Sequence, residues 1–243
     1  FAIQGENLYV LEVNPRSSRT VPFVAKSSGL PLARIAANIT IGIPLAKQTI
    51  PVRTSGNVCV KAPVFPFIKL RGLDPAPGPE MKSTGEVFGS HQDADVAYLK
   101  ARLATEVPVA SEGGVYLTVR DDDKANLVPI AQQLTKLGFT LYATSGTADV
   151  LRANSVPVEI VYRIRERMHP DALDLMRQGK ISFIVNVPTI SGGAVRDGNM
   201  MRRLAVELNI PFVTTIRGAK MEVAAIGAMM KGEMEPVRLQ VNY

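Results

Sequence analysis

The sequence predicts an α/β protein whose C-terminal part is a parallel sheet wrapped by helices. Beyond residue 105, short apolar runs alternate with segments of helical periodicity, which is typical of such a sheet. The 243 residues are 46% apolar and 21% charged, as in an ordinary packed protein. At ~150 residues per domain, this length fits one large domain or two small ones. We place a domain boundary at the change of pattern, which gives domains 1–105 and 106–243.

The elements of the C-terminal part follow from the apolar runs and from the helical periodicity between them. Strands are expected at 114–119, 139–143, 158–162, 181–187, 211–214 and 237–241. Helices are expected at 122–136, 147–153, 170–178, 196–208 and 219–231. Six strands and five helices suffice for a complete small domain.

The first 105 residues are less regular. The run from Leu8 to Val13 predicts a strand that ends at the turn-forming pair Asn14-Pro15. Pro31 opens a helix to Ile39, since proline is tolerated in a first helical turn. Further strands are expected at 58–67 and 81–89, and a polar connecting helix at 91–105.

Charge and composition exclude several classes of protein. Lys and Arg number 28 against 22 Asp and Glu, and the net charge of +6 is diffuse, unlike the basic face of a nucleic-acid binder. Residues 1–105 hold 12 basic and 7 acidic side chains, so most of the excess lies there. No run approaches the ~18 apolar residues of a membrane span. The single cysteine, Cys59, cannot form an internal disulfide, and we expect a protein of the reducing cytoplasm.

The densest polar motif of the N-terminal part follows its first predicted strand. Residues two apart share one face of a strand, so Glu12 and Asn14 would present a carboxylate and an amide oxygen together, as Mg²⁺ prefers. Arg16 and Arg19 add donors suited to phosphate oxygens. The alternative is a polar strand end with two solvated arginines.

The second motif joins a predicted strand to a helix, at Ala143–Thr147. Backbone N–H groups, the hydroxyls and the helix dipole can point there at one anion, and Gly146 lets the backbone approach closely. A plain N-cap is the alternative. Lys124 opens the preceding helix and Asn186 ends a strand, so both groups should meet the turn at the carboxyl rim of the sheet.

Two long motifs carry a resemblance to a known family. The run E-V-N-P-R-S-S-R-T-V-P-F-V, Glu12–Val24, and the run G-P-E-M-K-S-T-G-E-V, Gly78–Val87, are similar to the end of the second ATP-grasp unit in the large subunit of carbamoyl-phosphate synthetase. The resemblance implies that Glu12 and Asn14 hold Mg²⁺ or Mn²⁺ beside the ATP phosphates. It places Arg16 and Arg19 on the phosphate side as catalytic residues.

Residues 106–243 resemble the methylglyoxal-synthase-like allosteric domain that closes the same subunit. This resemblance implies phosphate contacts from Lys124, Thr144 and Thr147, and a contact of Asn186 with the ribose or base of a nucleotide effector. Arg163 stands where bacterial relatives tend to have a lysine in the same site. The effector-binding residues are thus expected to be Lys124, Thr144, Ser145, Gly146, Thr147, Arg163 and Asn186.

The resemblance also implies a function and partners. The parent enzyme would make carbamoyl phosphate from bicarbonate, two ATP and ammonia, which a glutaminase small subunit draws from glutamine. UMP or IMP would regulate it, and the rest of the large subunit would complete the ATP site. The family's glycine-rich lid would stand upstream of Phe1, so we expect this chain by itself neither to bind ATP tightly nor to turn it over. Ala62 replaces a carboxylate that helps to hold ornithine in regulated relatives, which makes ornithine activation doubtful.

Two other functions must be weighed. Methylglyoxal synthase uses the same fold, but its carboxylate base and histidine are not matched here, where the only histidines are His91 and His169. We therefore expect no such activity, and we interpret His169 as a surface cap residue. A free-standing module that binds a small phosphate compound remains the open alternative.

Overall fold

The computed structural model describes residues 1–50, 56–67, 69, 75–76, 81–188, 193–232 and 234–236. Residues 1–50 belong to one compact unit, and the described residues from Gly56 onward form the other. Compactness thus groups residues 56–105 with the C-terminal sheet. The boundary at 105/106 rests on the change of sequence pattern and on family resemblance, and it stays a prediction.

The N-terminal unit is a short hairpin followed by two helices. Strand β1 (Ala2–Gln4) pairs antiparallel with β2 (Asn7–Tyr9). The predicted strand over residues 8–13 is therefore wrong beyond Tyr9, because Tyr9 pairs with Ala2 and β1 offers no further partner.

Two helices complete this unit, α1 (Thr20–Ser28) and α2 (Leu32–Thr40). The pattern predicted α2 but missed α1, which contains Pro22. Proline is tolerated there because N–H groups in the first turn have no partner within the helix. No residue of 1–50 is buried, and Phe1, Ile3 and Val13 are each more than three-quarters exposed. This unit therefore has little core of its own.

The second unit begins with a hairpin covered by a helix. Strand β3 (Val58–Val64) pairs antiparallel with β4 (Gly85–His91) along its whole length. Helix α3 (Ala94–Leu103) packs on both strands. Its N-cap is Asp93, whose carboxylate accepts hydrogen bonds from the backbone N–H groups of Asp95 and Val96. The two predicted strands and the connecting helix are confirmed, with shifted ends.

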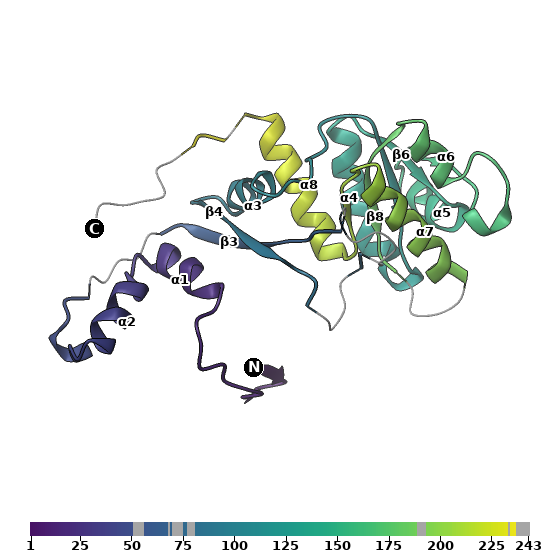
Figure 1. Ribbon diagram of the computed structural model, residues 1–243. Helices are drawn as coiled ribbons and strands as arrows, with labels where there is room; N and C mark the ends of the chain where they lie inside the picture. The colour runs from purple at the N-terminus through teal and green to yellow at the C-terminus, as the bar shows by residue number, and fades with distance from the viewer. Residues whose placement is uncertain are drawn as a thin grey trace. The chain divides into compact units, whose positions relative to one another are not determined.

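A five-stranded parallel sheet forms the centre of this unit (Figure 1). The strand order is β7-β6-β5-β8-β9, and every neighbouring pair is parallel. The strands are β5 (Gly114–Thr118), β6 (Thr140–Ala143), β7 (Glu159–Ile160), β8 (Ile181–Asn186) and β9 (Phe212–Val213). These confirm five predicted strands, while the one predicted at 237–241 lies outside the described residues.

All five predicted helices of the C-terminal part are confirmed, with ends that differ by a few residues. They are α4 (Lys124–Lys136), α5 (Ser145–Ala153), α6 (Ala172–Arg177), α7 (Gly193–Glu207) and α8 (Ile216–Met230). Short 3₁₀ turns lie at Asp121–Asp123 and Ile164–Glu166. Among the described residues, no helix has the length and apolar character needed to cross a lipid bilayer.

Alternation along the strands divides the core into two layers. Val115 and Leu117 of β5 face a cluster with residues of α4, α5 and α8. Tyr116, between them, faces the other cluster, with residues of α6 and α7. Successive strand side chains point to opposite faces, so helices must cover both sides of the sheet. The result is a three-layer α/β/α arrangement (Figure 1).

Helix α8 is buried from two sides. Val223 and Ile226 face the sheet, whereas Ala225 and Ala228 pack on Val96 and Leu99 of α3. These contacts join α3 to the helical layer that also contains α4 and α5.

A buried ion pair crosses the same contact. Glu222 of α8 is 1% exposed and accepts hydrogen bonds from Arg102 Nε (2.8 Å), Arg102 Nη2 (3.0 Å) and the Tyr98 hydroxyl (3.0 Å). Burial and the charge of Glu222 raise the pKa of Tyr98. A buried charge is tolerated only when it is paired, so this pair favours one register of α3 on α8.

The Arg102–Glu222 pair gives a prediction about stability. Glu222→Gln should lower the free energy of unfolding by about 3 to 5 kcal/mol, because it leaves the Arg102 charge without a countercharge at a mostly buried site. Urea unfolding monitored by circular dichroism measures this loss. As a control, Glu86→Gln removes one ion-pair partner of Lys61 in a more exposed pair and should cost about 1 kcal/mol or less. Equal losses in the two variants would contradict the prediction.

Candidate functional site

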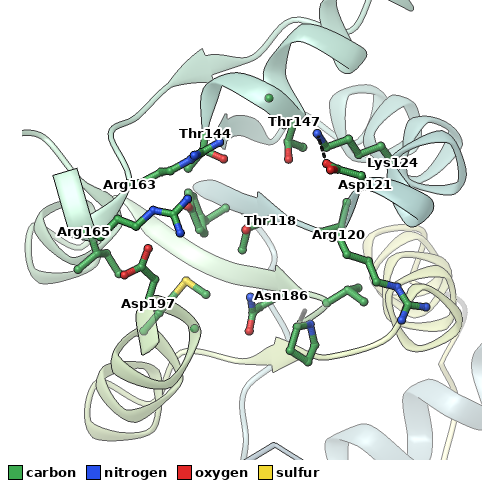
Figure 2. A pocket seen from close by; sticks show the side chains of 18 residues that line it. Thr118, Arg120, Asp121, Lys124, Thr144, Thr147, Arg163, Arg165, Asn186 and Asp197 are labelled. Carbon is green, nitrogen blue, oxygen red and sulfur yellow. Dashed lines mark ion pairs between the residues drawn. The ribbon is translucent and has the colours of Figure 1, made fainter. Parts of the chain in front are cut away.

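A cavity opens where the strand order of the sheet changes direction. The chain runs from β5 outward through β6 and β7, then returns to β8 on the other side of β5. Loops after β5 and β8 therefore diverge at their carboxyl ends, which is where open α/β sheets bind ligands. The cavity measures about 350 Å³, within the usual range for small-ligand sites. Figure 2 shows the 18 residues that line it.

The turn from β6 into α5 forms one wall. Thr144 is the N-cap residue with extended backbone, and its carbonyl accepts hydrogen bonds from Thr147 N (3.0 Å) and Ala148 N (2.9 Å). Its side chain makes no capping hydrogen bond, although it lines the cavity. The structure thus lacks the side-chain cap of the plain N-cap alternative. The buried residue Thr147 lines the same wall.

Gly146 lies where two cations approach the N-terminus of α5. A Cβ atom added to it would lie 3.2 Å from Lys124 Nζ and 3.9 Å from Arg163 Nη2. The missing side chain therefore leaves room for an ammonium and a guanidinium group over one turn of backbone. The positive end of the helix dipole points at the same place. These groups together form an anion-binding surface.

Lys124 already has an anionic partner. Its Nζ lies 2.7 Å from Asp121 Oδ1. Figure 2 marks this ion pair with a dashed line. The hydrogen bond and charge of Lys124 lower the pKa of Asp121. The Asp121 side chain is 91% exposed and Lys124 only 19%, so the carboxylate reaches the cation from the solvent side. An incoming anion must share Lys124 with Asp121 or replace it.

The opposite wall mixes charges. Arg163 precedes the 3₁₀ turn after β7, Arg165 lies within it, and Asp197 comes from α7. Arg163 Nε lies 4.0 Å from Glu166 Oε1 in a partly exposed pair. Burial raises the pKa of Asp197, against the opposing effect of the nearby arginines. Across the whole lining, four basic side chains, Arg120, Lys124, Arg163 and Arg165, face two acidic ones, Asp121 and Asp197, so the cavity carries an excess of positive charge.

Most of the predicted effector residues meet in this cavity. Those that line it are Lys124, Thr144, Gly146, Thr147, Arg163 and Asn186. Ser145 is exposed and is not part of the lining. The prediction omitted Thr118 and Arg120, although their position at the end of β5 was a usable signal. It also omitted Asp121, Arg165 and Asp197, for which no local motif stands out.

The N-terminal motif lies on exposed, irregular chain between β2 and α1. Asn14 Nδ2 donates a hydrogen bond to Glu12 Oε1 at 2.9 Å, so the two side chains meet although no strand holds them. Arg16 Nη1 donates to the carbonyl of Ser17 at 3.3 Å. Arg19 is the residue before α1. Their proposed roles with metal and phosphate remain predictions.

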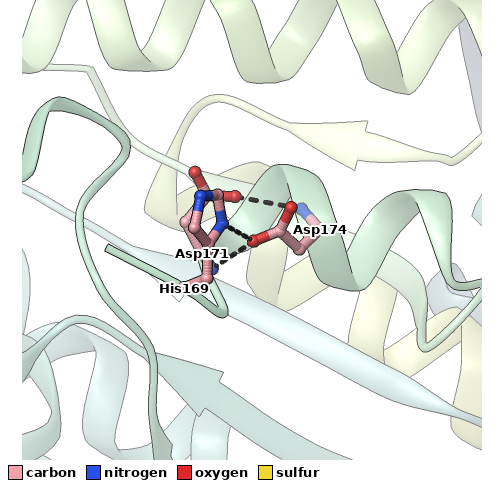
Figure 3. Close-up of side chains that lie close together, drawn as sticks. All are labelled: His169, Asp171 and Asp174. Atoms are coloured by element: carbon pink, nitrogen blue, oxygen red, sulfur yellow. Dashed lines mark hydrogen bonds and ion pairs between the residues drawn. The ribbon is translucent and has the colours of Figure 1, made fainter. Parts of the chain in front are cut away.

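His169, Asp171 and Asp174 form a separate cluster (Figure 3). Asp171 and Asp174 accept hydrogen bonds from each other's backbone N–H at 3.0 Å, which caps α6. Asp174 Oδ2 also lies 2.5 Å from His169 Nδ1. Hydrogen bonding and the charge of Asp174 raise the pKa of His169. The geometry is that of a helix cap with an ion pair on its surface.

Comparison with known proteins assigns both parts of the chain. The family pattern of the MGS-like domain matches residues 126–214, and that of the carbamoyl-phosphate synthase L chain, ATP binding domain, matches residues 1–48. The carbamoyl phosphate synthase large chain, C-terminal section, of Methanocaldococcus jannaschii is 45% identical over 96% of this chain and 40% of its own length.

Two further relatives agree. The corresponding section from Methanopyrus kandleri is 44% identical over 92% of this chain and 42% of its own length. The carbamoyl phosphate synthase large chain of Methanosarcina barkeri is 42% identical over 96% of this chain and 58% of its own length. The chain is homologous to the C-terminal part of carbamoyl phosphate synthase large chains. It spans between 40% and 58% of the length of these three relatives.

The Lys124–Asp121 pair generates a prediction about the cavity. Asp121→Asn should raise the affinity for inorganic phosphate about two- to fivefold, because it removes a competing carboxylate from the cation. Titration followed by ³¹P NMR measures the affinity. Asp122→Asn changes the net charge equally at a neighbouring exposed residue and serves as the control. An equal gain in the control would show a general charge effect instead of competition at Lys124.

The His169–Asp174 pair generates a prediction about pH. Because the pKa of His169 is raised in the folded state, its protonated form stabilises the fold below pH ~6.5. This stabilisation disappears as the pH rises through the folded-state pKa. The pKa of Asp174 is lowered, so its carboxylate stabilises the fold above pH ~3.9, and this stabilisation is lost as the pH falls through the folded-state pKa. The pair should therefore stabilise most between about pH 4 and 6.5.

Thermal unfolding of His169→Asn tests this expectation. The variant should fall further below the parent chain in melting temperature at pH 5.5 than at pH 8.5. Asp174→Asn removes the same pair from the other side and should show the same trend. A difference that does not change with pH would refute the ion-pair interpretation.

Proposed function

We propose that this chain is the C-terminal regulatory part of a carbamoyl phosphate synthase large chain, and that its cavity binds the phosphate of a nucleoside monophosphate such as UMP or IMP. The observation that carries this proposal is the approach of Lys124 and Arg163 to the position above Gly146. Two cations and a helix N-terminus meet at this point, and Thr144 and Thr147 line the same cavity. A phosphate monoester carries the charge and the acceptor oxygens that such a point requires.

The cavity also offers a polar group for the ribose or base of a nucleotide. Asn186, buried at the end of β8, provides a neutral polar group on a different strand from the phosphate turn. A ligand that reaches from α5 to β8 would contact both the cationic turn at α5 and Asn186. A bare phosphate would contact only the cationic turn.

For the parent enzyme we propose the synthesis of carbamoyl phosphate from bicarbonate, two ATP and ammonia released from glutamine by a partner glutaminase subunit. The match of residues 1–48 to the ATP-binding domain family and the three relatives support this activity. We place the enzyme in the cytoplasm, in keeping with its single cysteine.

Glu12 and Asn14 would contribute to a Mg²⁺ or Mn²⁺ site in that enzyme. Their oxygens fit a hard cation, and together they supply at most three of the six ligands that Mg²⁺ takes. Binding requires the Asn14 amide to turn, because its nitrogen now faces Glu12. Such an ion neutralises charge on a transferring phosphoryl group. Arg16 and Arg19 would hold phosphate oxygens beside it.

We propose that regulation uses the packed helices of the second unit. Lys124 is the first residue of α4, α4 packs on α8, and α8 packs on α3. An effector that prefers one arrangement of these helices shifts the equilibrium toward it. The helix α3 is then the element through which a nucleotide in the cavity influences the hairpin β3–β4.

Isothermal titration calorimetry of the full chain with UMP and IMP tests the ligand. Lys124→Ala should weaken binding about 10- to 100-fold, since it removes a charge-assisted contact, and Thr144→Ala about 2- to 10-fold. Lys136→Ala, at the other end of α4 and exposed, is the matched control and should leave affinity unchanged. No heat with either nucleotide, or an equal loss in Lys136→Ala, would overturn the proposal. Binding of inorganic phosphate without either nucleotide would instead favour the small-phosphate module.

A further inference from the structure

The orientation of the Asn186 amide is set by a buried arginine behind the cavity. Arg202 of α7 is 2% exposed, and its Nη1 donates a hydrogen bond to Asn186 Oδ1 at 2.5 Å. Its Nη2 donates to Asn199 Oδ1. The guanidinium group is thus held between α7 and the end of β8. It does not itself line the cavity.

This contact decides which end of the amide faces a ligand. A guanidinium group has only donors, so the Asn186 atom that it contacts must be the carbonyl oxygen. The amide nitrogen then lies on the opposite side. Figure 2 shows this nitrogen toward Thr118 and the middle of the cavity, with the oxygen turned away. Asn186 therefore presents N–H donors to a ligand and no acceptor.

The sequence of α7 provides space for this contact. A Cβ atom on Gly198 would lie 2.8 Å from Arg202 Nη1 and 3.4 Å from Asn186 Oδ1. Gly198 and Asn199 precede Arg202 by four and three residues, so all three share one face of the helix. Gly198 leaves room for the guanidinium group, and the Asn199 side chain accepts a hydrogen bond from it.

We propose that Arg202 is a positioning residue that makes Asn186 a hydrogen-bond donor, so that the cavity selects nucleotides with a keto oxygen over nucleotides with an amino group at the contacted base edge. This inference rests on the proposed function. Uracil and hypoxanthine carry a carbonyl oxygen where cytosine and adenine carry an amino group. An amino group facing the Asn186 amide would bring two donors together and leave both unpaired.

The test compares UMP with CMP, and IMP with AMP, on the full chain by calorimetry, with inorganic phosphate as a probe of the cation site alone. The parent chain should bind each keto nucleotide about tenfold or more tightly than its amino counterpart. Arg202→Met should reduce this preference to about twofold or less while phosphate affinity stays unchanged. Arg202→Lys should keep most of the preference, because an ammonium group also has only donors. Arg203→Met, at the exposed neighbour, is the control.

A second variant keeps the test valid if Arg202→Met does not fold. Asn186→Asp retains the contact with Arg202 but presents a carboxylate oxygen to the cavity, so it should invert the preference toward CMP and AMP. An unchanged preference in Arg202→Met or in Asn186→Asp would overturn the inference, as would equal affinities for UMP and CMP in the parent chain. The absence of any nucleotide binding by the parent chain would instead refute the proposed function.

Discussion

The site depends on one constraint of the parallel sheet, namely that all its strands end at the same edge. Thr118, Ala143 and Asn186 are far apart in the sequence, yet each ends a strand at this edge. The strand order reverses beside β5, so the loops there separate and leave a cavity instead of closing over the sheet. The contacts within the cavity, including the approach of Lys124 to the turn before α5, follow from this placement.

The same sheet explains why a charged pair is buried outside the cavity. Helix α8 covers one face of the sheet and also packs on α3, so its outer side is no longer solvated. Glu222 on that side must therefore find a countercharge within the protein, and Arg102 and Tyr98 surround it. The pair specifies how α3 packs, whereas the apolar contacts around it supply most of the favourable burial.

The features that the sequence predicted well are those set by local pattern. The strands β5, β6 and β8 are apolar runs. Thr144 and Asn186 follow from the rule that polar residues at strand ends meet at one rim, and Lys124 follows from its place at the start of the helix after β5. The predicted strand at residues 8–13 was wrong because pairing depends on a partner, and β1 is only three residues long. Ser145 belongs to the predicted turn, but its side chain is exposed at the start of α5 instead of lining the cavity.

What the sequence could not indicate is the role of residues whose importance depends on how a helix is rotated. Arg202 and Arg203 are identical neighbours in the sequence, but one is buried against Asn186 and the other is exposed. The cavity consequently has two chemically distinct ends: cations over the bare backbone of Gly146, and an oriented neutral amide at β8. An anion satisfies the first end and leaves the second unpaired. Only a ligand with an anionic group and a neutral acceptor, joined at the right separation, can satisfy both at once.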